Sequence, residues 1–527
     1  MRRRNLLWVA PCIVLGLSAC MTFRPAPGPM RLDTAKACAD WRWIGITSKP
    51  EVQCPQVPGW TVTPLFGQVA PPPNACKSGY ENEQGFDVIR ELNRFCVYET
   101  AGKKSGALAF PPAVSADLVR FDRDCAALSL SLDADLKANP WKSSYEDFQD
   151  LLPQAGQPEK LRIEGRPGVR LAFLDTQPTH KGVPQEWWHS RHGYTLARMA
   201  KHLVCSPDSR YSCAAQITTQ LALPIVRFDP EQKWEDKGID RDRGGYLGFQ
   251  SDLAEAIWNE VGDWQKDPRD GSPRHLVLNL SLAWDGELFG GLDEERIADM
   301  RAGTQAVYRA LQYAARFDVL VLASAGNQKR EPCANDGPLL PAAWEEGGPK
   351  EESCGEPRKG PLLYGVAGVR ADDTLLANAR ASGMPPRAAY GETAIFSGSS
   401  VATAVASSIA AVVWNAFPDR SSREIMQILD ESGKELDYPA DFWFRGSPHP
   451  TSRITKVRRL SLCDALVKAK EDDCHRKGLS TCPGQFACKS RPMSSGPTAA
   501  AIPGSCQPWL WPQPEEVPFP FGPPRYQ

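Results

Sequence analysis

The sequence has no excess of charge of one sign and no recognisable internal repeat. Its 527 residues include 61 Lys and Arg against 63 Asp and Glu, which gives a formal net charge of -2. A protein that binds nucleic acid usually carries a clustered basic footprint, so we expect no nucleic-acid partner. Hydrophobic residues make up 42% of the chain, enough for one large globular domain with flanking segments.

The apolar segment at the start of the chain is too short to cross a membrane. Three arginines follow the first methionine, and an apolar run then extends from Leu6 to Leu17. A membrane-spanning helix needs roughly 20 apolar residues, so the pattern indicates a secretory signal over residues 1–19. The run ends in LSAC at Cys20, which resembles the lipobox of bacterial lipoproteins. Ordinary cleavage after Ala19, with Cys20 as a free or bridged thiol, is the alternative.

The lipobox resemblance implies a protein anchored in the bacterial cell envelope. In such proteins the cysteine is acylated, and an Asp directly after it favours retention in the inner membrane. Here that residue is Met21. We therefore expect lipidation of Cys20, membrane contact through that lipid, and anchoring in the outer membrane. The face of the membrane, periplasmic or external, is left open.

No Cys-x-x-Cys pair occurs among the 16 cysteines, which favours disulfides over zinc. Cys12 lies in the signal and Cys20 is the expected lipid site, so fourteen remain for pairing in an oxidising compartment. Short spacing predicts the bridge Cys205–Cys213, and a second bridge is expected between Cys333 and Cys354, which bracket an acidic loop. The others form an N-terminal group and a C-terminal group of five each: Cys38, Cys54, Cys76, Cys96 and Cys125, then Cys463, Cys474, Cys482, Cys488 and Cys506. Five is odd, so at least one bridge should join the two groups.

Composition divides the exported chain into four segments. These are a Pro-rich spacer (20–65), a small disulfide-bearing N-terminal module (66–160), a main domain (161–437) and a C-terminal extension rich in Cys, Pro and aromatic residues (438–527). In the main domain, strand-like apolar runs alternate with helical patterns. This predicts an α/β fold with a mostly parallel sheet between helices, flanked by irregular disulfide-rich extensions. Such sheets bind ligands beyond the carboxyl ends of their strands.

Four polar residues stand at strand ends or helix starts on that expected ligand side. Asp175 ends the run VRLAFLD, His192 begins the next helix, Asn327 ends VLVLASAGN, and Ser400 follows Gly398 at the start of a small-residue helix. Each has a simple structural explanation when taken alone: turn former, half-exposed helix-start histidine, turn asparagine or N-cap serine. Gly398 would let the backbone turn sharply. Only the set of four in this order indicates a site.

The set resembles the signature blocks of the subtilisin-like serine proteases, or subtilases. The matching residues are Asp175-Thr176, His192-Gly193 with Ala197, SAGN ending at Asn327, and Gly398-Ser399-Ser400-Val401-Ala402. The stretch LNLSLAW also resembles the strand that lines the substrate cleft, which implicates Ser281, Leu282, Ala283 and Trp284. The resemblance covers about residues 161–437.

The resemblance implies a serine endopeptidase that acts on polypeptides through an acyl-enzyme and needs no cofactor. Ser400 would be the nucleophile, His192 its general base, and Asp175 the group that orients His192. The Asn327 amide and the Ser400 backbone N–H would bind the oxyanion. We expect no metal site, because no Asp-rich calcium loop of recognisable pattern is present. Calcium itself is left open, and disulfides could replace its stabilising role.

The chain also departs from the family pattern. Gln177 stands in place of a glycine, Tyr194 in place of Thr or Ser, Ser399 in place of a common threonine, and Ala404 in place of a proline. None removes a catalytic atom, but together with Trp284 they favour a divergent branch with an altered pocket. Two alternatives to a peptidase follow: a catalytically silent binding or scaffold protein with a blocked cleft, and a hydrolase of esters.

The N-terminal module has two interpretations. It could be an inhibitory propeptide that is cleaved away, as in many subtilases. Alternatively it stays attached, because its removal would separate the main domain from the lipid on Cys20. The expected bridge between the N-terminal and C-terminal cysteines favours retention, and the sequence alone leaves the oligomeric state unknown.

Overall fold

The computed structural model arranges the chain as two sheets with surrounding helices. It describes residues 38–67, 88–100, 117–129, 168–176, 192–205, 213–223, 247–266, 273–286, 290–292, 296–327, 338–347, 360–374, 376, 379–380, 385–392, 397–437 and 456–479. The signal segment with Cys20 and the expected Cys333–Cys354 bridge lie outside the described residues.

The larger sheet has eight strands in the order β13-β14-β12-β11-β10-β8-β5-β6. In that order they are Lys434–Asp437, Lys456–Arg459, Arg387–Tyr390, Tyr364–Val369, Leu320–Ser324, His275–Leu280, Val169–Asp175 and Gln216–Leu221. All neighbours pair in parallel except β13 with β14, which are antiparallel. The predicted mostly parallel sheet is confirmed.

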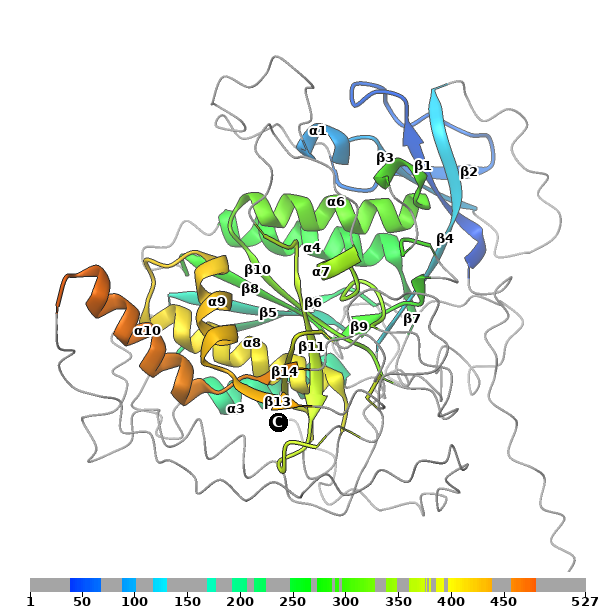
Figure 1. Ribbon diagram of the computed structural model, residues 1–527. Helices are drawn as coiled ribbons and strands as arrows, with labels where there is room; N and C mark the ends of the chain where they lie inside the picture. The colour runs from blue at the N-terminus through cyan, green and yellow to red at the C-terminus, as the bar shows by residue number, and fades with distance from the viewer. Residues whose placement is uncertain are drawn as a thin grey trace, which may run out of the picture.

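Helices cover both faces of this sheet (Figure 1). One face carries α4 (Gln250–Gln265) and α6 (Ala302–Arg316), and the other carries α3 (His192–Val204) and α8 (Ser399–Ala416). Strand β5 shows why: Ala172 and Leu174 pack into the core under α4 and α6, whereas Leu171 and Phe173 pack into the core under α3 and α8. A strand buried on both faces is typical of parallel sheets between helix layers. The predicted three-layer α/β class is therefore confirmed.

The helix α8 is the central element of the second layer. It contacts β5, β8, β10, β11 and β12. Among the described residues it is also the one helix long and apolar enough to cross a membrane by length and composition, and 89% of its 18-residue window is buried inside the protein. The small-residue helix expected at this position is present, and it lies in the core.

The second sheet contains the N-terminal segment, and its strands run antiparallel in the order β2-β3-β1-β4-β7. In that order they are Trp60–Pro64, Phe95–Thr100, Cys38–Thr47, Leu118–Ser129 and Leu247–Phe249, with the short strand β9 (Leu282–Ala283) also paired to β4 and the helix α1 (Val88–Leu92) beside them. An irregular spacer was expected up to residue 65, and this is wrong for Cys38–Thr47 and Trp60–Pro64, which form strands. Nearby prolines concealed β1. Its partner strands come later in the chain, in β3 and in β4, which reaches Cys125.

The expectation of irregular structure after residue 437 is also wrong for 456–476. Strand β14 joins the main sheet beside β12, and α10 (Leu462–Arg476) packs on α8 and α9 (Ser422–Ser432). The strand is only four residues long and mostly basic, so its sequence gave little apolar signal. The short helices η4 (Ile297–Asp299) and α7 (Trp344–Gly347) complete the described elements.

The disulfides that join two described cysteines each lie within one region. The predicted bridge Cys205–Cys213 is confirmed. Two bridges, Cys38–Cys125 and Cys54–Cys96, lie inside the N-terminal sheet. They use four of the five N-terminal cysteines, so the predicted bridge to the C-terminal group now depends on the fifth, which lies outside the described residues. Both cysteines of α10 are disulfide-bonded as well.

Candidate active site

Asp175 and His192 form a buried pair at the carboxyl end of β5. The Nδ1 atom of His192 lies 2.9 Å and 2.8 Å from the two carboxylate oxygens of Asp175. The exposed fraction is 7% for His192 and 1% for Asp175. A nitrogen that donates to a carboxylate leaves the other ring nitrogen as the basic one. That atom, Nε2, is buried and has no hydrogen-bond partner among the described residues, so it is available to accept a proton.

Gly193 allows this pair to form. A Cβ atom at this position would lie 2.3 Å from the Thr176 carbonyl oxygen and 2.7 Å from the Asp175 Cβ. The backbone N–H of Gly193 also donates to the Thr176 hydroxyl at 3.1 Å. The start of α3 therefore touches the end of β5 directly, which explains in physical terms why a glycine follows His192.

Ser400 lies in the first turn of α8 and is fully buried. Its hydroxyl is 3.4 Å from the Ser281 carbonyl oxygen, and the Ser281 hydroxyl donates to the Ser400 carbonyl oxygen at 3.1 Å. In the part of the chain that is described, no hydrogen bond joins Ser400 to His192, although α3 and α8 pack against each other. Catalytic hydrogen bonds often tighten only when substrate binds, so this geometry leaves the pairing available.

Gly398 does not make the sharp turn that the sequence suggested. Its backbone is extended, with φ 163° and ψ 164°, and it caps α8 without a side chain. Such dihedral angles are open to any residue. The turn into the helix is instead held by backbone hydrogen bonds, among them the bond from the Gly398 N–H to the Gly391 carbonyl at 2.8 Å.

Asn327 is held in a fixed orientation by the residue before Ser400. Its Oδ1 atom accepts hydrogen bonds from the backbone N–H and the hydroxyl of Ser399, both at 2.9 Å. A backbone N–H can only donate, so the atom facing it must be the amide oxygen. The Nδ2 donor of Asn327 therefore points away from Ser399. The sequence reading treated Ser399 only as a departure from the family, and it missed this contact.

The strand expected to line the substrate cleft is already paired with another part of the chain. Strand β9 begins directly after Ser281, and its neighbour is the end of β4, which runs antiparallel to it. The register places Ser129 opposite Leu282. Because Ser281 contacts the Ser400 hydroxyl, the end of β4 runs toward Ser400. On its other edge the same segment pairs with β7, so it lies between two strands of the main domain.

Trp284 directly follows β9, the strand expected to line the cleft, and it lies in the protein core. It is fully buried, and its backbone exchanges two hydrogen bonds with Leu340, at 2.8 Å and 3.0 Å. Its ring meets Trp344 edge-on, with 5.5 Å between ring centroids. Ala283 and Leu282 beside it are also fully buried. Of the predicted cleft residues, Ser281 thus contacts Ser400, whereas Leu282 and Trp284 pack into the core under α4 and α6.

The structure places all the predicted site residues that it describes in one region. Asp175, His192 and the Ser281–Trp284 strand lie at the same edge of the sheet as Asn327 and Ser400, whereas Cys20 lies outside the described residues. Among the described residues, no group of three His, Cys, Asp or Glu side chains could hold a metal ion.

Comparison with known proteins finds one family model that matches part of the chain. Residues 272–442 match the model of the subtilase family, Peptidase_S8. The resemblance drawn from the sequence is confirmed in that this part of the chain is similar to the subtilase family. No curated protein matches the sequence.

Several solved structures of proteases and of a cytotoxin are similar to the chain at low identity. A structure of the subtilase cytotoxin SubAB assembly matches with 19% identity, a TM-score of 0.39, and coverage of 64% of this chain and 100% of that one. The patellamide maturation protease PatA matches with 19% identity, a TM-score of 0.35, and coverage of 58% and 98%. The MycP3 protease of the type VII (ESX-3) secretion system matches with 18% identity, a TM-score of 0.37, and coverage of 65% and 92%.

Proposed function

We propose that the protein is a serine endopeptidase in which Asp175, His192 and Ser400 form the catalytic triad. The observation that carries this proposal is the buried His192–Asp175 contact. It leaves Nε2 with no hydrogen-bond partner among the described residues, on a helix that packs against the one that begins at Ser399. The subtilase match over 272–442 includes Asn327 and Ser400, and it supports the same activity.

The mechanism follows from the roles of the three side chains. The Ser400 hydroxyl attacks the carbonyl carbon of a peptide bond, and His192 Nε2 takes the hydroxyl proton as the new C–O bond forms. Asp175 stabilises the resulting imidazolium through Nδ1. His192 then gives the proton to the leaving amine, and the C–N bond breaks. In the second half, His192 takes a proton from water as the water oxygen attacks the acyl carbon. It returns that proton to the Ser400 oxygen as the ester bond breaks.

Asn327 and the start of α8 would stabilise the oxyanion. The intermediate carries negative charge on oxygen, and the positive end of a helix dipole favours such charge. Ser399 bonds to the oxygen of Asn327, and the amide group that can donate to an oxyanion is Nδ2. The Ser400 backbone N–H, in the first turn of α8, would be the second donor.

We further propose that the enzyme is exported and lipid-anchored through Cys20, in the outer membrane of a bacterial envelope. The support is the sequence alone: the arginine-rich start, the short apolar run and LSAC followed by Met21. Mass spectrometry of the mature N-terminus tests it. A diacylated Cys20 is expected, and an unmodified N-terminus at Cys20 would contradict it.

Fluorophosphonate labelling tests the nucleophile. The purified mature protein should be labelled at Ser400, and Ser400→Ala should abolish labelling. Ser408→Ala is the matched control, because Ser408 lies on the same helix, is equally buried and bonds only to the Ala404 carbonyl among the described groups. Labelling should survive that change. A folded wild type that is not labelled before or after limited proteolysis of 38–129 would refute the proposal.

A silent scaffold protein is the second candidate. The observation that favours it is the end of β4, which already occupies the edge of the cleft strand. A scaffold predicts a folded, disulfide-bonded protein whose Ser400 resists the probe even when β4 is displaced. Proteolysis followed by labelling therefore separates a silent protein from an enzyme whose cleft is covered.

A further inference from the structure

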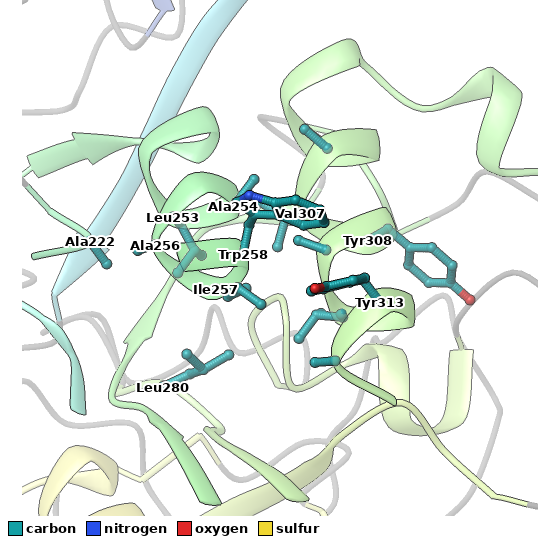
Figure 2. Packing of buried hydrophobic residues seen from close by; sticks show 14 of the residues in the cluster. Ala222, Leu253, Ala254, Ala256, Ile257, Trp258, Leu280, Val307, Tyr308 and Tyr313 are labelled. Atoms are coloured by element: carbon teal, nitrogen blue, oxygen red, sulfur yellow. The ribbon is translucent and has the colours of Figure 1, made fainter. Parts of the chain in front are cut away.

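The N-terminal sheet shares one hydrophobic core with the main domain. Ile44, Phe66 and Ile89 belong to the same buried cluster as Trp258 of α4 and Tyr313 of α6. The ring of Phe66 meets that of Trp258 with centroids 5.9 Å apart, and Figure 2 shows Trp258 and Tyr313 at the contact between the two helices.

The helix α6 is covered on both sides. Every residue from Ala302 to Ala314 is buried, which includes polar side chains such as Gln305 and Gln312. A helix at the surface of a domain keeps a polar stripe in water. The elements β1, β4 and α1 instead pack against α6 from the side away from the main sheet (Figure 1). Without the N-terminal sheet, buried residues of α6 would therefore be exposed to solvent.

Charged side chains join the N-terminal sheet to the main domain near the middle of β4. Arg42 of β1 places Nε 3.1 Å from Asp124 of β4 and Nη2 2.7 Å from Asp252 of α4, while Nη1 lies 3.1 Å from Glu99. Asp124 is fully buried and accepts hydrogen bonds from the backbone and hydroxyl of Ser251. We call Arg42, Asp124, Ser251 and Asp252 the docking cluster.

Two carboxylates of β4 also satisfy the starts of the two helices beneath it. Asp124 accepts from the Ser251 N–H in the first turn of α4, and Asp122 accepts from the Ala302 N–H at the start of α6, at 2.9 Å. Orphan N–H groups at a helix start need such partners, and negative charge there is favourable. The disulfide Cys38–Cys125 then ties β4 to β1 at the residue directly before the segment 126–129, which pairs with β7 and β9.

We propose that the N-terminal sheet is a permanent part of the folded protein, and that the docking cluster controls how often segment 126–129 leaves the cleft strand. The sheet stays because its removal would uncover α6 and separate Arg42 from its ion pair with Asp252. Substrate enters when the end of β4 separates from β9 while β1 and the rest of β4 stay docked. This inference rests on the proposed function for the identity of the cleft. The separation of segment 126–129 from β9, with the rest of β4 in place, can be measured without catalysis.

Hydrogen exchange and probe labelling on the full mature chain test the proposal together. The variants are Arg42→Ala, Arg42→Lys and the control Lys477→Ala, which removes an equal charge from an exposed ion pair with Asp473 on α10. In the wild type, the amides of β7 and β9 should exchange slowly. Loss of one partner of a buried ion pair is strongly destabilising, so Arg42→Ala should raise the exchange rate of these amides about 100-fold.

The labelling rate at Ser400 should rise with it, and Lys477→Ala should match the wild type in both measurements. Arg42→Lys keeps the charge but loses the fork that reaches three carboxylates, so it should give an intermediate effect. It also serves if Arg42→Ala does not fold. Slow exchange of the paired amides of β1 and β3 in these variants shows that the sheet itself remains folded.

Each remaining outcome decides the proposal. A mature protein that lacks residues 38–129, or exchange of β9 that is the same in wild type and both Arg42 variants, overturns it. Faster exchange without labelling in any variant supports the opening strand and refutes the peptidase activity instead. The two proposals can therefore fail separately.

Discussion

The replacement Gly193→Ala tests whether the close approach of α3 to β5 creates the His192–Asp175 pair. The new Cβ would meet the Thr176 carbonyl oxygen at 2.3 Å, where ordinary van der Waals contact begins at 3.4 Å. The start of α3 must therefore retreat by about 1 Å, and such a displacement of a catalytic group costs on the order of 10²-fold in rate. Complete loss of the orienting carboxylate contact would cost about 10⁴-fold.

Two measurements follow this variant. Turnover of a peptide substrate should fall by at least about 100-fold, and the proton NMR signal of the His192 Nδ1–H, held by Asp175, should shift or disappear. Gly262→Ala is the matched control, because nothing lies within 4 Å of a Cβ at that position of α4. Alanine favours a helix over glycine by roughly 0.5–1 kcal/mol, so this variant should be active and slightly more stable. Wild-type turnover with an unchanged Nδ1 signal in Gly193→Ala would refute the reasoning.

Four further predictions address other parts of the molecule. Asn327→Ala should lower kcat by about 10²–10³-fold with little change in KM. A rise in KM as large as the fall in kcat would instead indicate a structural role. Trp284→Ala should lower the free energy of unfolding by about 3–5 kcal/mol in urea titrations, because the side chain is fully buried. Burial raises the pKa of Asp124 to about 7 from 3.8. The folded state thus holds this proton more tightly, so wild-type stability relative to Asp124→Asn should be highest below about pH 4 and should decline as the pH rises to 7; a difference that is constant with pH would contradict it. Non-reducing mass spectrometry should find Cys76 joined to a cysteine within 463–506, and a peptide map without that link would show that no bridge joins the two groups.

The sequence predicted the main sheet and the site because both leave local signals. Apolar runs such as VRLAFLD end in a single polar residue, and Asp175, His192, Asn327 and Ser400 each follow such a run or begin a helix. Their meeting follows from parallel topology, since the carboxyl ends of the strands share one edge. The local pattern could therefore be extended to a three-dimensional site.

The parts that were not predicted depend on distant partners. Strand β1 is stabilised by β3 and β4, which lie far along the chain, and by Arg42 contacts more than 200 residues away. The role of Ser399 depends on the orientation of the Asn327 amide, and the covering of the cleft depends on the register between β4 and β9. No periodicity within one segment contains that information.

The strand pair β13–β14 has a consequence for any shortened form of the protein. Strand β14 lies between β12 and β13, and it comes after the boundary at 437 that composition suggests. A chain that stopped there would leave the N–H and C=O groups of β12 unpaired along an open edge and would remove α10 from α8 and α9. Open edges of this kind recruit strands from other molecules. Such a fragment would hold every proposed catalytic residue and would still be expected to aggregate, so recombinant forms should extend at least through Arg476.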